Sequence, residues 1–255
     1  MRLLGNQTAI VFGGSGMIGS AACRMLARHG AHTVVHFNRN RKTAHHIVSQ
    51  IKDAGGSAIA LQADVTDSRS IGPFIDEVVA LYGSIHIAVD TVHNPSEHKL
   101  IRDMEWSDWG THLDALKGHF TLCKSVLPIM RAQKYGRIVY LSGGLSYRFF
   151  KGCAPYSTIK AGLNAFCKTL ALEEGERNIT VNIVAPGKVT AAAPQQETDM
   201  SFERDEISNR SAADNPLKRF ATPEDVAGAI LYFVSPAASG ITGQTLFVAG
   251  GEIMP

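Results

Sequence analysis

Tyr156 and Lys160 stand four residues apart in the segment "APYSTIKAGLNAF", near the start of a predicted helix. Side chains at this spacing lie on one face of a helix and project toward the same pocket. A tyrosine side chain has a pKa of about 10, and a neighbouring ammonium group lowers that pKa because it favours the phenolate. Such a pair is able to protonate a carbonyl oxygen as a hydride arrives, or to remove the proton in the reverse direction.

A glycine turn near the start of the chain is the second element with chemical meaning. In "AIVFGGSGMIGS", residues 9–20, Gly14, Gly16 and Gly19 form a GxGxxG pattern between a predicted strand and a predicted helix. Glycine permits a tight turn, and the backbone N–H groups at the helix start suit a pyrophosphate. The turn therefore predicts a dinucleotide site; the alternative is a glycine turn that only lets the helix pack on the sheet. The residues expected to bind it are Gly13, Ser15, Gly16, Met17 and Ile18.

The end of the second predicted strand indicates which dinucleotide binds. The segment "NRNRK", residues 38–42, contains no Asp or Glu. An acid at this place accepts the ribose hydroxyls of NAD, whereas arginine without an acid suits the additional phosphate of NADP. We therefore expect NADP(H) to be favoured over NAD(H), with Arg39 as the first phosphate ligand, Arg41 as the second and Asn40 as the third. The alternative is a solvated run of surface charge.

Short β-branched segments alternate with longer helical segments along the chain. The predicted strands are residues 8–13, 32–37, 57–63, 84–90, 136–142, 178–184 and 244–250. Strand followed by helix, repeated about six times, predicts a parallel sheet with right-handed crossovers. We expect an α/β fold, a Rossmann-like doubly wound parallel sheet of about seven strands with helices on both faces, over residues 1–255 as one domain. The stretch at about 187–214 has no clear period, which is typical of a substrate flap.

Composition excludes several classes of function. The net charge of +2 is too small to favour nucleic acid or an anionic membrane as a partner. No apolar run reaches the roughly 18 residues of a membrane span, and no signal peptide precedes the first strand, so we expect a cytoplasmic protein. The cysteines lack CxxC spacing, which predicts free buried thiols. His45 and His46 lack a third ligand at suitable spacing, so no metal site is expected.

These motifs together resemble the short-chain dehydrogenase/reductase family, in its single-domain branch. The further matching segments are "LQADVTD", "YSTIK", "VNIVAPG", "RFATPEDVAGAILYFVS" and "ITGQTLFVAGG", in family order along nearly the whole chain. The resemblance implies that Tyr156 is the catalytic acid/base and that Lys160 binds the nicotinamide ribose and tunes the tyrosine. It also implies further cofactor contacts: Asp64 and Val65 at the adenine, Thr91 beside the cofactor, and Pro186, Gly187 and Val189 at the nicotinamide.

The chain departs from the family pattern at several places. Met17 replaces the usual middle glycine, Phe12 replaces a threonine, and residues 90–93, "DTVH", replace the family's "NNAG". The catalytic asparagine, which in the family anchors a water that relays protons to the lysine, aligns with Ala115. His93 is a candidate for the pocket, and the alternative is a structural histidine.

The catalytic serine of the family, which helps to hold the substrate oxygen, aligns with Gly143. Ser142 is the first candidate to replace it and Ser146 the second; the alternative for Ser142 is that it ends the fifth predicted strand by bonding its own backbone. Loss of one polar contact to a developing charge costs on the order of 10² to 10³ in rate.

Two functions follow from these residues. The first is an NADP-dependent oxidoreductase that transfers a hydride between nicotinamide and a carbonyl or alcohol substrate, with Tyr156 as acid/base assisted by Lys160. The resemblance implies that Phe149, Phe150, Met200 and Phe202 line the substrate pocket, which favours a substrate with an apolar body; the alternative is ordinary loop packing. The alternative is a non-catalytic or weakly active nucleotide-binding homologue, acting as a sensor or partner subunit. The resemblance also implies a homo-oligomer, a tetramer or a dimer.

Overall fold

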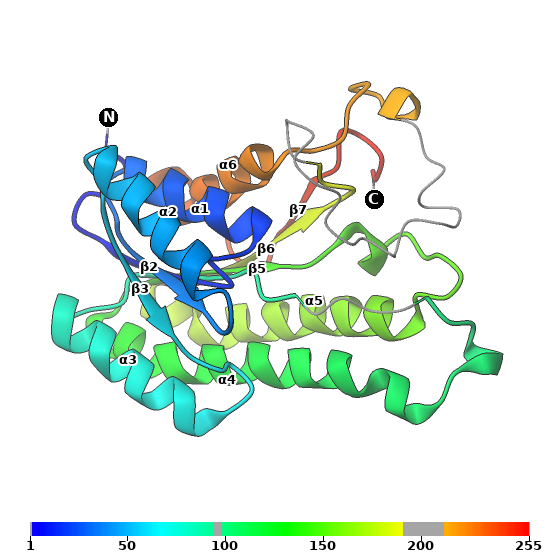
Figure 1. Cartoon of the computed structure of the whole chain (residues 1–255), viewed down its shortest axis with the longest axis horizontal. Helices are drawn as coiled ribbons and strands as arrows, with labels where there is room; N and C mark the ends of the chain where they lie inside the picture. Colours follow the sequence, from blue (N-terminus) through cyan, green and yellow to red (C-terminus); the bar gives the residue numbers. More distant parts are fainter. Residues whose placement is uncertain (1, 94–97, 191–211, 255) are drawn as a thin grey trace.

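Seven parallel strands form one sheet at the centre of the molecule (Figure 1). The computed structural model describes residues 2–93, 98–190 and 212–254. The strand order is β3-β2-β1-β4-β5-β6-β7, and every described pairing is parallel. The strands are β1 (Thr8–Phe12), β2 (His32–Phe37), β3 (Ser57–Gln62), β4 (Ile87–Asp90), β5 (Gly136–Leu141), β6 (Ile179–Pro186) and β7 (Thr245–Val248).

Helices cover both faces of this sheet. One layer contains α1 (Met17–Arg28), α2 (Arg41–Asp53) and α6 (Pro223–Val234), and the other contains α3 (Ser68–Tyr82), α4 (Gly110–Gln133) and α5 (Ala154–Glu174) (Figure 1). The predicted doubly wound fold is confirmed. Short 3₁₀ helices stand in the loops, and two of them, Trp106–Trp109 and Gly144–Ser146, lie near the starts of α4 and α5.

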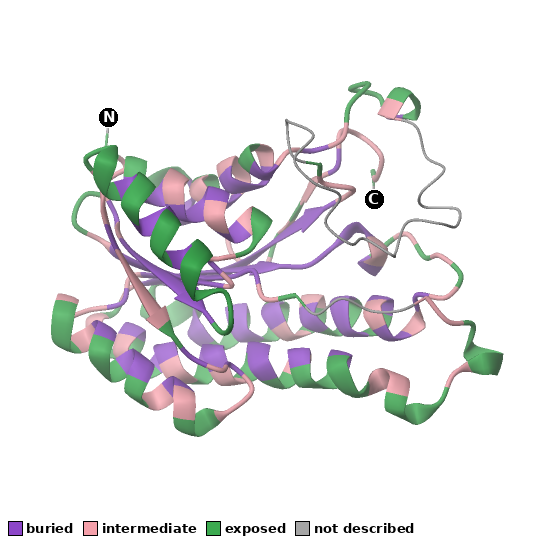
Figure 2. Cartoon of the chain, in the orientation of Figure 1, coloured by how far each residue is buried: buried purple, intermediate pink, exposed green. Residues whose placement is uncertain are grey.

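Alternation along each strand divides the core into two parts. On β1, Ala9 and Val11 pack toward α1, α2 and α6, whereas Ile10 and Phe12 pack toward α3, α4 and α5. Successive side chains of a strand point to opposite faces of the sheet, so an apolar run without alternation fills both cores. Figure 2 shows the result, a sheet whose central strands are buried between helices that are buried on the sides that face it.

The fourth strand begins later than the sequence predicts. The prediction covered residues 84–90, but β4 begins at Ile87. The reason is a side chain: the Thr8 N–H donates to Nδ1 of His86 at 3.0 Å instead of continuing the ladder to a backbone carbonyl. Strand β6 continues two residues further than predicted, to Pro186, because Pro186 still pairs with Val248 of β7.

The other structural expectations have separate outcomes. All four cysteines are free and buried. Among the described helices, none is long and apolar enough to cross a membrane. The predicted flap at 187–214 falls mostly on residues 191–211, which lie outside the described residues.

Candidate active site

The candidate site lies at the carboxyl ends of the strands, where the topology changes direction. β1 pairs with β2 on one side and with β4 on the other. The chain therefore runs from β1 toward one edge of the sheet and, after β3, returns past β1 and continues toward the other edge. In open α/β sheets, ligands bind in the crevice at such a switch point. The glycine turn follows β1 at this crevice, and residues 91–93 follow β4 beside it.

The glycine turn is closely packed against the end of β4. Gly13 has φ = +75°, a conformation that glycine adopts without strain. A Cβ atom on Gly13 would stand 2.8 Å from Oγ1 of Thr91, and one on Gly19 would stand 2.2 Å from the carbonyl oxygen of Gly13. Thr91 is buried, and its hydroxyl donates to the carbonyl of Phe12 at 2.8 Å. Thr91 therefore supports the turn from below, at the place expected for a cofactor neighbour.

His36 braces the same turn, and the sequence analysis missed it. The Gly13 N–H donates to Nδ1 of His36 at 3.0 Å, and Nε2 lies 3.1 Å from the carbonyl oxygen of Ala63. The first bond requires an acceptor at Nδ1, so the proton resides on Nε2 and the ring is neutral. Burial lowers the pKa of His36 to about 4, which keeps it neutral. A histidine inside the apolar run "VVHF" was the available signal.

The helix start beside the turn suits an anion. Helix α1 begins at Met17 with Gly16 as its N-cap, no side chain caps its first turn, and no acid stands there. Gly16 and Met17 are exposed, and Ser15 and Ile18 are half-buried. The open N–H groups and the positive end of this 12-residue helix are suited to a pyrophosphate. This uncapped helix start fits the dinucleotide that the sequence predicts.

The residues expected at the adenosine end follow β2 and β3. Arg39, Asn40 and Arg41 are all exposed at the start of α2. Asp64 accepts hydrogen bonds from the N–H and hydroxyl of Thr66, which together hold the pKa of its carboxyl below its usual range. Val65 is buried and faces Gly118 of α4, where a Cβ atom would stand 3.1 Å from its Cγ2.

The residues expected at the nicotinamide end follow β6. Pro186 is the last residue of β6, and the N–H of Gly187 donates to the carbonyl of Val248 at 3.1 Å. Val189 forms an isolated parallel bridge with Ala221. These contacts fix the segment "APGKV" at the carboxyl edge of the sheet, on the same side as the glycine turn.

Tyr156 and Lys160 meet in one pocket, as the helical spacing predicts. Lys160 is buried, its Nζ donates to the carbonyl of Leu141 at 2.9 Å, and this Nζ lies 5.8 Å from the centre of the Tyr156 ring. Burial lowers the pKa of Lys160 to about 8, and the carboxylate of Asp90 opposes that shift. Burial raises the pKa of Tyr156 to about 12, with a smaller contribution from Cys153.

The direction of the tyrosine shift differs from the sequence-based expectation. A neighbouring ammonium was expected to lower the pKa, but burial of the phenol raises it, because the phenolate loses hydration. Tyr156 therefore holds its proton firmly in this state. A tyrosine in this environment is suited to donate a proton to an oxygen that gains negative charge.

Gly143 stands where a serine side chain would meet the tyrosine. A Cβ atom on Gly143 would lie 2.7 Å from Oη of Tyr156. The two candidate replacements have other partners: the Ser142 hydroxyl donates to the carbonyl of Lys160 at 3.4 Å, and the Ser146 hydroxyl donates to the carbonyl of Gly143 at 2.7 Å. Ser146 also accepts from Asn164 at 3.0 Å. Both hydroxyls therefore bind groups of the loop after β5 or of helix α5.

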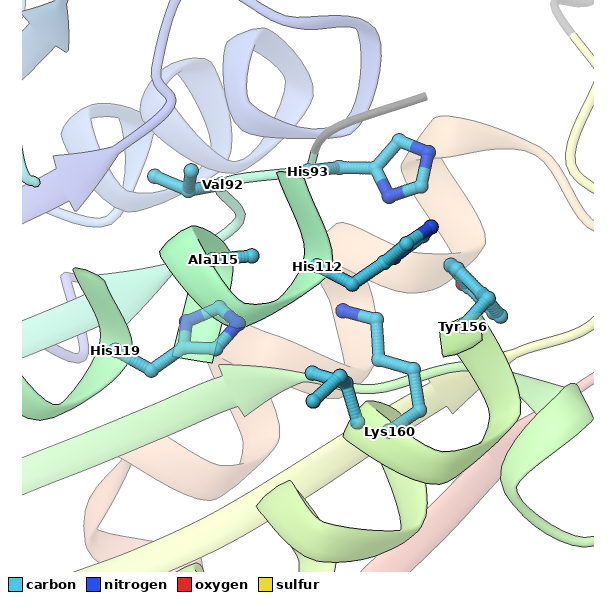
Figure 3. Close-up of a pocket in the computed structure, with 8 residues that line it drawn as sticks. Val92, His93, His112, Ala115, His119, Tyr156 and Lys160 are labelled. Atoms are coloured by element: carbon cyan, nitrogen blue, oxygen red, sulfur yellow. The ribbon is translucent and has the colours of Figure 1, made fainter. Parts of the chain in front are cut away.

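Three histidines complete the pocket, and the sequence analysis singled out only one of them. The pocket is lined by Val92, His93, His112, Ala115, His119, Tyr156, Ile159 and Lys160 (Figure 3). The rings of His93 and His112 stand nearly at right angles to that of Tyr156, with centroids at 5.7 and 6.2 Å. His93 thus faces the pocket. The signal for His112 and His119 was their spacing from Ala115, because residues three and four apart lie on one face of a helix.

Known proteins match this chain over nearly its whole length. Residues 14–252 match a family described as enoyl-(acyl carrier protein) reductase. A 3-oxoacyl-[acyl-carrier-protein] reductase from Synechocystis sp. is 35% identical and covers 100% of both chains. The enzyme of the same name from Staphylococcus epidermidis is 33% identical over 98% of this chain and 100% of its own.

Solved structures agree with the sequence matches. A dehydrogenase/reductase from Sinorhizobium meliloti has a TM-score of 0.85 at 28% identity and covers 97% of this chain and 95% of its own. A mutant short-chain dehydrogenase/reductase from Serratia marcescens has a TM-score of 0.86 at 27% identity, with 98% of each chain covered. The chain belongs to the short-chain dehydrogenase/reductase family. Its activity is that of an NAD(P)-dependent oxidoreductase.

Proposed function

We propose that this chain is an NADPH-dependent reductase of carbonyl compounds with an apolar body, and that 3-oxoacyl thioesters are the substrate class to test first. The observation that carries the proposal is the pairing of Tyr156 with Lys160 in one pocket at the carboxyl edge of the sheet. The substrate class comes from the relatives, two of which are 3-oxoacyl-[acyl-carrier-protein] reductases. The preference for NADPH rests on the exposed arginines of the "NRNRK" segment.

The chain's own residues have the following roles in this proposal. The turn from Gly13 to Ile18 holds the pyrophosphate. The remaining nucleotide contacts are Arg39, Asn40, Arg41, Asp64, Val65, Thr91, Pro186, Gly187 and Val189. When bound, the nicotinamide supplies the hydride. Tyr156 Oη donates its proton to the carbonyl oxygen, and the Lys160 ammonium stabilises the phenolate that remains.

The test has two stages, and a matched variant controls the second. The first measures binding of NADPH and of NADH by fluorescence; NADPH is expected to bind at least about tenfold more tightly. The second measures reduction of a 3-oxoacyl-CoA by the protein and by Tyr156→Phe. Loss of a positioned acid costs about 10² to 10⁴ in rate. Tyr232→Phe on α6, which removes an exposed phenol far from the pocket, is the control.

One observation favours a second function. With glycine at 143 and the hydroxyls of Ser142 and Ser146 bonded elsewhere, the substrate oxygen has fewer donors than in the family pattern. A nucleotide-binding sensor or partner subunit needs no such donor. Tight NADPH binding together with equal rates for the protein and Tyr156→Phe would establish this alternative and refute the reductase.

We also propose a homo-oligomer formed through the outer surfaces of α4, α5 and β7. Large apolar side chains are exposed there: Leu113 and Phe120 on α4, Leu172 on α5 and Leu246 on β7. Exposed apolar side chains on adjacent helices favour a protein interface. Light scattering after size-exclusion chromatography measures the mass, and a monomer at micromolar concentration would refute the proposal.

A further inference from the structure

A row of side chains on α4 faces the tyrosine and lysine of α5. His112, Ala115 and His119 follow one another at spacings of three and four residues, which places them on one side of a helix. All three line the pocket that also contains Tyr156 and Lys160. Ala115 holds the position of the family's asparagine, so an apolar methyl group stands between two imidazoles.

His119 is held by a buried carboxylate. Its Nδ1 lies 2.6 Å from Oδ2 of Asp90, and both side chains are almost fully buried, at 1% and 4% exposed. The other oxygen of Asp90 accepts the N–H of Val92 at 3.0 Å, which fixes the carboxylate. The carbonyl of His119 also accepts the hydroxyl of Tyr140 at 3.1 Å.

The bond to Asp90 determines what His119 presents to the pocket. A carboxylate accepts but does not donate, so the Nδ1 atom of His119 carries a proton and the Nε2 atom of the neutral ring has a lone pair that is able to accept one. Figure 3 shows the far edge of the ring turned toward the Lys160 amine. An imidazole oriented by a carboxylate is a geometry that proteins use for proton transfer.

The pocket between these groups is small. Its cavity volume is about 10 Å³, close to the least that one water needs. The pocket that His119 and Lys160 both line thus has room for about one water. His93, which is exposed, stands at the mouth of the same pocket and connects it with solvent.

We propose that His119, oriented by Asp90, is a proton-relay residue that resupplies Lys160, in place of the water that the family's missing asparagine would anchor. The proposal rests on the proposed reductase function. The role of His119 differs from the family pattern because a titratable side chain relays the proton, in place of a water held by an asparagine. His119 lies on the turn of α4 that follows Ala115.

The proton balance is as follows. After Tyr156 gives its proton to the carbonyl oxygen, the phenolate takes one from the Lys160 ammonium. Nε2 of the neutral His119 ring then takes a proton from solvent through the pocket mouth and passes that proton to the neutral amine, so the imidazole returns to its starting state. The Nδ1 proton of His119 and the charge of Asp90 are unchanged, so only N–H and O–H bonds form and break.

Several titratable groups face His119, and the test must separate them. Asp90 comes from β4, Tyr140 from β5, Lys160 and Tyr156 from α5, His93 from the loop after β4, and His112 from α4 itself. Cys123 stands four residues after His119 on α4. Burial and the Lys160 charge both lower the pKa of His112, so this second imidazole favours its neutral form.

The first experiment uses His119→Asn in the full chain. An asparagine amide is able to keep the hydrogen bond to Asp90 but has no titratable nitrogen. We expect kcat for 3-oxoacyl-CoA reduction to fall about 10- to 100-fold with KM within twofold, and the solvent deuterium isotope effect on kcat to rise. Adding Ala115→Asn to His119→Asn introduces the asparagine of the family's relay, and we expect it to raise kcat again by about tenfold. His46→Asn, on the exposed side of α2, is the control.

Two results would overturn the relay. One is a kcat for His119→Asn within twofold of the unmodified chain. The other is a loss of kcat without a change in the isotope effect, accompanied by a lower melting temperature and not recovered by Ala115→Asn, since this identifies a purely structural residue.

A second measurement keeps the relay testable when the chain reduces no thioester. In the nucleotide-free protein, the imidazole NMR signals of His119 are followed against pH, with and without Lys160→Met. We expect these signals to titrate and the midpoint to move when the lysine is removed. Signals that do not titrate between about pH 5 and 10, or that ignore Lys160→Met, refute proton exchange between the two residues. Failure to bind NADPH refutes only the proposed function.

Discussion

Replacement of Gly143 tests how the tyrosine works without its serine. Gly143 has φ = −165° and ψ = 158°, an extended backbone that any residue adopts, so a side chain brings no backbone strain. The added Cβ atom would stand 2.7 Å from Oη of Tyr156, whereas ordinary contacts begin at 3.4 Å. The phenol must therefore move by roughly 0.7 Å.

The size of the effect follows from that displacement. A misplacement of about 1 Å at a reacting group costs about 10²-fold in rate. We expect Gly143→Ala to reduce kcat on the order of 10-fold. Gly143→Ser displaces the phenol equally but adds a hydroxyl that donates to the substrate oxygen, and one such donor is worth on the order of 10² to 10³ in kcat. Gly143→Ser should therefore be at least about tenfold faster than Gly143→Ala.

The assay is NADPH oxidation with a 3-oxoacyl-CoA at saturating substrate, and Gly162→Ala is the matched control. A Cβ atom on Gly162, which lies on the exposed side of α5, meets no atom within 4 Å. If Gly143→Ala retains full activity, the phenol does not act from its present position. If the alanine and serine variants have equal rates, position 143 is not the place of the missing serine.

Three further variants test other parts of the site. Arg39→Ala should weaken the binding of NADPH about 10- to 100-fold and leave the binding of NADH unchanged, as measured by fluorescence titration. Arg28→Ala at the far end of α1 is the control, and equal weakening of both nucleotides would contradict the phosphate contact. His36→Leu leaves the Gly13 N–H and the Ala63 carbonyl without their partner, and should lower the free energy of unfolding in urea by about 1–3 kcal/mol for each group. A loss no larger than that of the exposed control His46→Leu would show that His36 does not stabilise the turn. Folding lowers the pKa of Lys160 from 10.5 to about 8, so its charged form opposes folding most below pH 8 and not at all above 10.5. Lys160→Met should thus gain up to about 3 kcal/mol below pH 8, and denaturation across pH should show that gain vanish as the pH rises; a constant difference would contradict it.

Local patterns were sufficient for the sheet and for the central pair. The β-branched runs and their glycine boundaries predicted all seven strands, and the spacing of Tyr156 and Lys160 placed both side chains in one pocket. Errors came at strand ends, where a side chain such as His86 takes a ladder hydrogen bond. Propensity and periodicity contain no information on that exchange.

The surroundings of the pair depend on contacts that are distant in sequence. Asp90 and His119 are separated by 29 residues, and each alone reads as an ordinary polar residue near the end of an element. The direction of the Tyr156 pKa shift likewise depends on burial, which only the packed structure defines. The Ser142 hydroxyl follows the same rule, since its partner is a carbonyl on α5.

The glycine turn is supported from both parts of the core. His36, which accepts the N–H of Gly13, packs against Phe12 and against Phe74 of α3, whereas α1, which follows the turn, packs against α6. A buried substitution in either layer is therefore expected to change the proposed nucleotide site. Selection, natural or in the laboratory, is thus expected to alter nucleotide affinity and turnover together rather than separately.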